Sequence, residues 1–124
     1  MKILIVDDDQ DLCQLTRLIL TKFGHDVTAF CDPDEGIAHA RKSKPNLILM
    51  DVMLPGLTGP EIVQQLKDDA QLKDVPVVFL TGLVTGSEQS LQKEGVMVGG
   101  IKYPALGKPF EIEKLRDIVQ KFAK

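Results

Sequence analysis

Four short apolar runs in this 124-residue chain each lead to a reactive polar residue. ILIV precedes Asp7 and Asp8, LILM precedes Asp51, VVFL precedes Thr81, and a weaker run leads to Lys108. If these runs are parallel strands of one sheet, their carboxyl ends lie side by side. Ligands of open α/β sheets bind at that edge. The sequence therefore predicts one polar crevice that holds three carboxylates, a hydroxyl and an ammonium group.

Strand and helix signals alternate five times along the chain. A continuous run of Leu and β-branched residues predicts a strand at 2–6. Further strands are predicted at 26–31, 46–50 and 76–80, and residues 101–106 predict a broken fifth strand. Apolar residues at helical spacing, with capping and stop residues, predict helices at 10–23, from Pro33 to before Pro45, at 59–70, between Thr85 and Gly95, and at 111–122. Alternating units of this kind predict an α/β fold, a doubly wound parallel sheet of five strands with five helices, in one domain over residues 1–124.

Two details indicate how these elements pack. In the first helix the apolar residues Leu12, Leu15, Ile19 and Phe23 follow helical spacing, which is typical of a buried face. Pro104 interrupts the fifth strand. Because proline has no N–H to donate, a strand that contains it belongs at an edge of the sheet.

Composition excludes some classes of function. The net charge is −3, and Lys and Arg are interleaved with acidic residues, so no basic face is available for direct binding of nucleic acid. No apolar stretch approaches the length of a membrane span, and the N-terminus becomes acidic too soon for a signal peptide. We therefore expect a cytoplasmic protein without a membrane partner.

The cysteines and histidines do not predict a further site. Cys13 and Cys31 lack the spacing of metal ligands, so we expect two small, buried or half-buried residues. His25 and His39 fall away from the predicted edge, so we expect both on the surface.

The acidic residues predict a metal ion. An acidic loop that caps a helix would explain Asp7 and Asp8, but not Asp51 as well. Two carboxylates about 4 Å apart repel by roughly 4 kcal/mol at an effective dielectric constant near 20. Three in one crevice need a cation, and a hard ion with few carboxylate ligands and several waters is typically Mg²⁺, with Mn²⁺ as a substitute.

The order of the polar residues indicates phosphoryl transfer. Asp51 follows a central buried strand as a lone acid, and an aspartate can act as a nucleophile toward a phosphoryl donor. The transferred group spreads its charge over three oxygens. Lys108 can contact one of them and the hydroxyl of Thr81 a second, while the metal ion neutralises the third.

These motifs resemble the receiver domain of two-component response regulators. The matching segments are ILIVDDD at 3–9, LILMDVMLPGLTG at 47–59, VVFLTG at 77–82 and GKPF at 107–110. The resemblance covers the whole chain and implies a flavodoxin-like sheet with the strand order 2-1-3-4-5. It implies that Asp51 accepts the phosphoryl group, that Lys108 and Thr81 contact it, and that Asp7, Asp8, Asp51 and the backbone carbonyl of Met53 bind Mg²⁺.

The resemblance also implies partners. A sensor histidine kinase or a histidine phosphotransfer protein would supply the phosphoryl group. A downstream protein would bind the face formed by the fourth helix, fifth strand and fifth helix, which can also support a homodimer. Such a domain is a switch whose phosphorylation and dephosphorylation are self-catalysed, rather than an enzyme that turns over a metabolite.

One departure from the family pattern and several rival hypotheses stay open. Receivers usually carry an aromatic residue three positions before the lysine, where this chain has Ala105, and Tyr103 lies two residues earlier. The chain can be a complete regulator, the N-terminal receiver of a longer DNA-binding transcriptional regulator, or a pseudo-receiver scaffold that works without phosphorylation. An Asp-nucleophile phosphatase is disfavoured, because Met53 stands where such enzymes place a second acid.

Overall fold

A five-stranded parallel sheet forms the centre of the protein, in the order β2-β1-β3-β6-β9. The computed structural model describes residues 1–51, 53–54, 57–70, 72–81, 96–98, 101–103, 105–107 and 112–122. The five strands are β1 (Lys2–Val6), β2 (Asp26–Phe30), β3 (Leu47–Asp51), β6 (Val77–Thr81) and β9 (Ala105–Gly107). The predicted doubly wound sheet and the order 2-1-3-4-5 are thereby confirmed.

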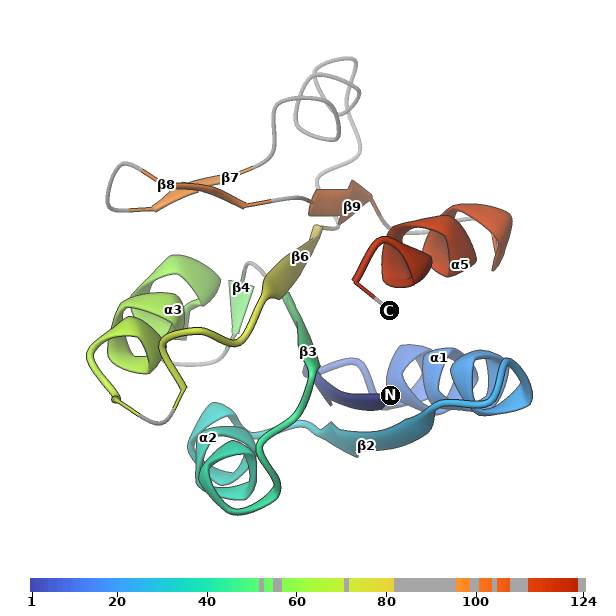
Figure 1. Ribbon diagram of the computed structural model, residues 1–124, viewed down its shortest axis with the longest axis horizontal. Helices are drawn as coiled ribbons and strands as arrows, with labels where there is room; N and C mark the ends of the chain where they lie inside the picture. Colours follow the sequence, from blue (N-terminus) through green and yellow to red (C-terminus); the bar gives the residue numbers. More distant parts are fainter. Residues whose placement is uncertain are drawn as a thin grey trace.

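Helices cover both faces of this sheet (Figure 1). One face carries α1 (Gln10–Lys22) and α5 (Ile112–Gln120), and the other carries α2 (Pro33–Ser43) and α3 (Gly59–Lys67). The predicted helix between Thr85 and Gly95 lies outside the described residues. Each observed helix begins within one residue of its predicted start, although α3 ends at Lys67 and not at residue 70.

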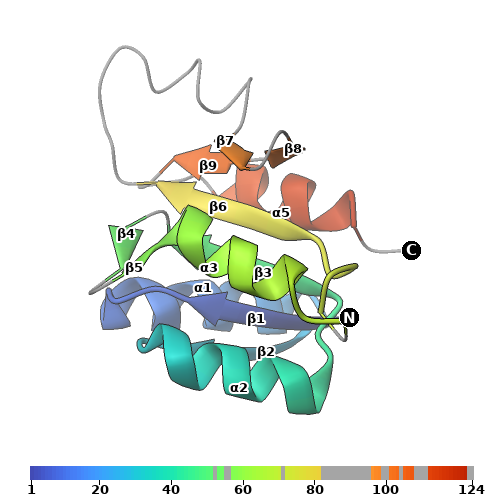
Figure 2. The same cartoon turned by 90° about the vertical axis from the view of Figure 1, so that its left-hand side faces the viewer.

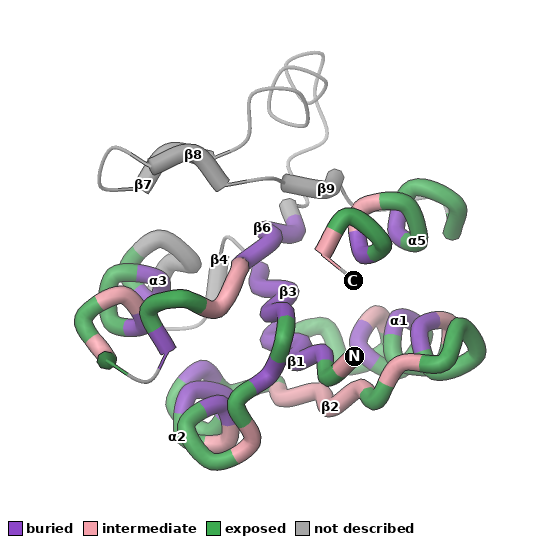
Figure 3. Tube along the Cα trace, viewed as in Figure 1, coloured by how far each residue is buried: buried purple, intermediate pink, exposed green. Residues whose placement is uncertain are grey.

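Two apolar cores form because successive side chains of a strand point to opposite faces. Leu4 and Ile48 lie in the core beneath α2 and α3, whereas Ile5 and Leu49 lie in the core beneath α1 and α5. Strand β3 is buried along its whole length, as Figure 3 shows. Packing on both faces of β3 therefore holds Asp51, the last residue of this strand, in place.

Helix α2 packs closely against the end of β1. It begins as predicted, with Asp32 as N-cap accepting a hydrogen bond from the backbone N–H of Asp34, and with Pro33 in the first turn. A Cβ atom added to Gly36 would lie only 2.8 Å from Cγ2 of Val6. The absence of a side chain at Gly36 thus sets the distance between α2 and the last residue of β1.

The buried face of α1 differs from the prediction. Cys13, Thr16 and Leu20 face the core, whereas the side chain of Leu15 is 54% exposed and Phe23 lies on the surface. Helix α1 has more apolar residues than a single face can hold. Helical spacing alone therefore does not predict which of these residues face the core.

The fifth strand of the sheet is shorter than predicted and starts later. Ala105–Gly107 pairs with β6, whereas Ile101–Tyr103 forms β8, which pairs antiparallel with β7 (Val96–Val98). A second antiparallel pair joins β4 (Met53–Leu54) and β5 (Leu57–Thr58). Pro104 separates β8 from β9 in the sequence, and a residue without an N–H is unsuited to continue a ladder. Tyr103 therefore belongs to a hairpin and not to the parallel sheet.

The outcome for the cysteines and histidines is mixed. Cys13 is buried as expected, but Cys31 is exposed. His25 and His39 were expected on the surface and are partly exposed, and the ring of His39 packs against Phe30 with the ring centroids 5.0 Å apart. Within the described residues, none of the helices has both the length and the apolar character needed to cross a membrane.

A candidate metal centre at the carboxyl ends of the strands

Three carboxylates meet at the carboxyl ends of β1 and β3. Asp7 and Asp8 follow β1, Asp51 ends β3, and the pairing of Val6 with Met50 sets these two strand ends side by side. One carboxylate oxygen from each of the three residues lies within 4.8 Å of the others. Asp7 and Asp51 are buried, and Asp8 is exposed. The sequence prediction that these acids converge is therefore correct in its geometry.

Hydrogen bonds hold Asp7 in place. Its backbone N–H donates to the carbonyl oxygen of Phe30 at 3.1 Å, and its Oδ1 accepts from the backbone N–H of Asp9 at 3.0 Å. Asp9 is also the N-cap of α1, accepting from the N–H of Leu12 at 3.1 Å. The Cys13 thiol donates to the carbonyl oxygen of Asp7 at 3.3 Å. The end of β1 and the start of α1 thus form one hydrogen-bonded unit.

The electrostatics of this cluster suit a hard divalent cation. Two unit charges 4.8 Å apart repel by about 3.5 kcal/mol at an effective dielectric constant near 20, and burial of two of the three carboxylates limits screening by water. The N-terminus of α1, whose dipole favours negative charge, begins beside the cluster. Carboxylate oxygens are the ligands that Mg²⁺ and Ca²⁺ prefer, so the residues present fit such an ion.

Thr81 and Met53 lie at the same edge of the sheet. Thr81 is the last residue of β6, one position beyond Leu80, which pairs with Asp51. Met53 is in β4, two residues after Asp51. The carboxyl ends of β1, β3 and β6 point to the same side, next to β4 and β5 (Figure 2). The structure describes the backbone of Thr81 and Met53, whereas Lys108 lies outside the described residues.

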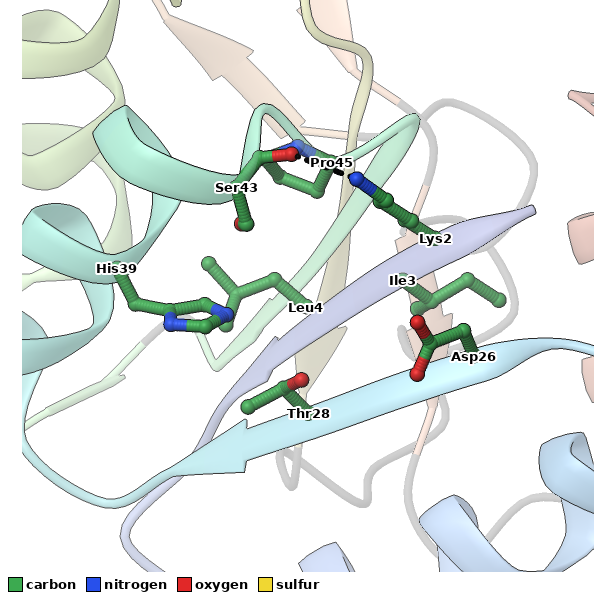
Figure 4. Close-up of a pocket in the computed structure, with 8 residues that line it drawn as sticks. All are labelled: Lys2, Ile3, Leu4, Asp26, Thr28, His39, Ser43 and Pro45. Carbon is green, nitrogen blue, oxygen red and sulfur yellow. Dashed lines mark hydrogen bonds between the residues drawn. The ribbon is translucent and has the colours of Figure 1, made fainter.

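A separate crevice lies at the opposite, amino end of the strands (Figure 4). Its volume is about 180 Å³, and it is lined by the apolar residues Ile3, Leu4 and Pro45 and by the polar residues Lys2, Asp26, Thr28, His39 and Ser43. The charged groups here are of both signs. Lys2 Nζ donates to the carbonyl oxygen of Ser43 at 3.3 Å, a bond visible in Figure 4.

Hydrogen bonds also hold the backbone at the amino end of the sheet. The Lys2 N–H donates to Oδ1 of Asn46 at 2.8 Å, and the Asn46 N–H donates to the carbonyl oxygen of Lys2 at 2.8 Å. The N-terminal amine lies 3.2 Å from Nδ1 of His25. Burial lowers the pKa of His25, and the positive amine lowers it further.

Comparison with known proteins agrees with this geometry. The family model described as the response regulator receiver domain matches residues 3–120. The chain belongs to the response regulator receiver family. It is therefore a signalling domain of two-component systems and not a classical enzyme.

Two curated relatives differ in how much of their length the receiver covers. The chain is 37% identical over 114 residues to the DNA-binding dual master transcriptional regulator RpaA of Synechocystis, covering 92% of this chain and 45% of RpaA. It is 35% identical over 114 residues to the protein PilH of Pseudomonas aeruginosa, covering 92% of this chain and 90% of PilH. The chain thus spans about half of one relative and most of the other.

Solved structures show the same receiver fold. The chemotaxis response regulator CheY4 of Vibrio cholerae matches with a TM-score of 0.80 and 29% identity, covering 98% of this chain and 97% of that one. The structure of NtrX from Brucella abortus matches with a TM-score of 0.78 and 28% identity, and there the chain covers 26% of the longer protein.

Sequence reasoning missed Cys13 as a neighbour of the candidate metal centre. Cys13 lies six residues after Asp7, and the helix start predicted near residue 10 was the signal that could have found it. In the structure Asp9 caps that helix and Cys13 occupies its first turn.

Proposed function

We propose that this receiver domain, residues 1–124, accepts a phosphoryl group onto Asp51 in a Mg²⁺-dependent reaction. The observation that carries the proposal is the convergence of the Asp7, Asp8 and Asp51 carboxylates within 4.8 Å at one end of the sheet. Membership of the receiver family supports a histidine kinase or a histidine phosphotransfer protein as the donor, in the cytoplasm.

The chemistry assigned to each group follows from its position. A carboxylate oxygen of Asp51 attacks phosphorus, the P–N bond of the donor phosphohistidine breaks, and its electron pair returns to the imidazole nitrogen. Bound Mg²⁺ supplies the positive charge that offsets the carboxylates and the phosphoryl oxygens. Asp7, Asp8, Asp51 and the backbone carbonyl of Met53 would hold the ion.

Two further residues complete the proposed site. Lys108, two residues beyond Leu106 of β9, and Thr81, at the end of β6, would each meet one phosphoryl oxygen. Attack of water on the phosphorus of phospho-Asp51 then returns the carboxylate and releases phosphate. The domain thus acts as a self-catalysed switch.

The output is protein–protein contact through the face that contains β9 and α5. Ala105 occupies the strand position where receivers usually carry an aromatic residue, and Tyr103 lies in β8. We therefore propose that the usual aromatic switch is absent and that the phosphorylated state is recognised through other groups of this face. The 45% coverage of RpaA supports a receiver joined to a DNA-binding module, and the 90% coverage of PilH supports a receiver that acts alone.

Intact-mass spectrometry tests the proposal. The wild-type protein is incubated with Mg²⁺ and acetyl phosphate, beside Asp51→Asn and the control Asp34→Asn, which changes an exposed carboxylate in the first turn of α2. One phosphoryl adduct is expected on the wild type and the control, and none on Asp51→Asn or in EDTA. An adduct on Asp51→Asn would refute the assignment, and a wild type that binds neither Mg²⁺ nor phosphate would indicate a pseudo-receiver.

A further inference from the structure

The thiol of Cys13 lies against the backbone of Asp7, a residue of the candidate metal centre, and has no part in the proposed chemistry. Its side chain is on the buried face of α1, with 3% of the residue exposed, and Sγ lies 3.3 Å from the carbonyl oxygen of Asp7. We propose that Cys13 is a positioning residue, whose hydrogen bond to the Asp7 carbonyl sets the direction of the Asp8 carboxylate for Mg²⁺. This inference rests on the proposed function, because it concerns the same site.

The hydrogen bond acts on the peptide group that joins the two acids. The carbonyl of Asp7 belongs to the planar peptide unit whose other end is the N–H of Asp8. Holding this carbonyl oxygen limits rotation of that plane, and so limits the directions in which the Cα–Cβ bond of Asp8 can point. Asp8 is exposed and therefore depends on its backbone for orientation more than a packed residue does.

The hydrogen bonds that hold Asp7 include one from the thiol of Cys13. The Asp7 N–H binds the carbonyl of Phe30, its Oδ1 accepts from the N–H of Asp9, and its carbonyl accepts from the thiol. The first two bonds fix the start of the residue and its side chain. Only the third, among these bonds, acts on the peptide that leads to Asp8.

The position of the thiol is itself fixed by the helix. The Cys13 N–H donates to the carbonyl oxygen of Asp9 at 3.0 Å, which is the first turn of α1. Cys13 forms no disulfide within the described residues, and its thiol keeps the S–H that donates to the carbonyl oxygen of Asp7. The first turn of α1 therefore fixes the position of the Cys13 thiol next to the end of β1, where it donates its weak hydrogen bond.

Isothermal titration calorimetry with MgCl₂ tests the inference on the full chain. Loss of partners that orient metal ligands typically weakens binding about 10–100-fold, and for a weak thiol donor acting through the backbone we expect Cys13→Ala to raise the Mg²⁺ Kd roughly 3–10-fold. Cys13→Ser retains a donor and is expected to recover at least half of that loss. The acetyl phosphate rate at saturating Mg²⁺ should stay within about twofold of wild type, because Cys13 touches no reacting atom.

Thr16→Ala is the matched control. Thr16 is buried on the same face of α1, and its hydroxyl has no hydrogen-bond partner within the described residues. Its thermal midpoint in EDTA is measured beside that of Cys13→Ala, and Thr16→Ala should leave the Mg²⁺ Kd unchanged.

Three results would overturn the inference. These are an unchanged Kd in Cys13→Ala, an equal loss of affinity in Thr16→Ala, and a Cys13→Ser variant no better than Cys13→Ala. A wild type that binds no Mg²⁺ would instead refute the proposed function. The two failures are therefore distinguishable.

Discussion

The two ends of the parallel sheet use polar residues in opposite ways. At the carboxyl end, Asp7, Asp8 and Asp51 bring three groups of the same charge within 4.8 Å. At the amino end, Lys2 finds the carbonyl of Ser43 and the side chain of Asn46, in a crevice whose charged groups are of both signs. Charged groups of opposite sign lie together at the amino end, whereas three groups of like charge lie together at the carboxyl end. The proposed function therefore places the chemistry at the carboxyl end, and we expect the polar groups of the amino end to contribute to stability.

The largest expected effect comes from the packing beneath the carboxyl end. Gly36→Ala gains helix propensity but forces a methyl group against Cγ2 of Val6, a buried β-branched residue directly before Asp7. We expect a net loss of about 1–2 kcal/mol in the free energy of unfolding, measured by urea denaturation, and weaker Mg²⁺ binding. Ala38→Ser, at an exposed position of α2, should stay within about 0.5 kcal/mol. A stabilised Gly36→Ala protein would contradict the close packing.

A smaller effect of opposite sign should follow from removing one of the like charges. In EDTA, Asp8→Asn should raise the free energy of unfolding by roughly 1 kcal/mol, because the repulsion among the carboxylates is relieved and Asp8 is exposed enough for water to screen part of it. Thermal unfolding with and without Mg²⁺ checks this. Saturating Mg²⁺ at about 100 times Kd should stabilise the wild type by about 2.7 kcal/mol and the variant much less.

The control for that experiment is Asp11→Asn, which removes an exposed carboxylate from the first turn of α1. It should slightly destabilise the protein, since a negative charge near a helix N-terminus is favourable. It should also leave the stabilisation by Mg²⁺ intact. Equal behaviour of the two variants would contradict the view that the cluster is strained by like charges.

At the amino end, loss of a polar group should affect stability and leave the function unchanged. Asn46→Ala removes the acceptor of the Lys2 N–H, which costs about 0.5–1 kcal/mol for an exposed hydrogen bond. Urea denaturation measures the cost, and calorimetry should give an unchanged Mg²⁺ Kd. A changed affinity for Mg²⁺ would show that the two ends of the sheet are coupled and would contradict the separate roles assigned to them.

The smallest effect concerns pH at the amino end. Burial, with help from the N-terminal amine, lowers the pKa of His25 below its ordinary value near 6.5. The folded protein therefore binds this proton less readily than the unfolded chain, so the contribution of His25 is fully present above pH 6.5 and is lost as pH falls toward the lowered value. Denaturation midpoints measured between pH 7.5 and 5.5 should fall more in the wild type than in His25→Gln. Parallel profiles would contradict this.

The sequence was most informative where burial on both faces left little choice. Strands β1 and β3 are continuous apolar runs, so their positions and the polar residues that follow them could be predicted. The convergence of Asp7, Asp8 and Asp51 followed from parallel strands alone. The roles of Thr81, Lys108 and Met53 stay predictions, because no described side-chain contact tests them.

The sequence was less informative where several local structures were equally compatible with it and tertiary packing selects one of them. Helix α1 has apolar residues around most of its circumference, and only contact with the sheet selects Cys13, Thr16 and Leu20 as its buried face. Residues 101–106 were predicted as one broken strand, and they divide between β8 and β9, with Pro104 between the two in the sequence. The hydrogen bond from the Cys13 thiol to the Asp7 carbonyl depends on how the start of α1 is placed relative to the end of β1. A local sequence pattern does not specify that placement.

The most direct test of the central claim locates the phosphoryl group. The protein is incubated with Mg²⁺ and acetyl phosphate, reduced with borohydride, which converts an acyl phosphate to an alcohol, and digested for peptide mass spectrometry. The account predicts homoserine at position 51, dependent on Mg²⁺, with Asp7 and Asp8 unchanged. Modification at Asp7 or Asp8, or phosphate on His25 or His39 instead, would contradict it.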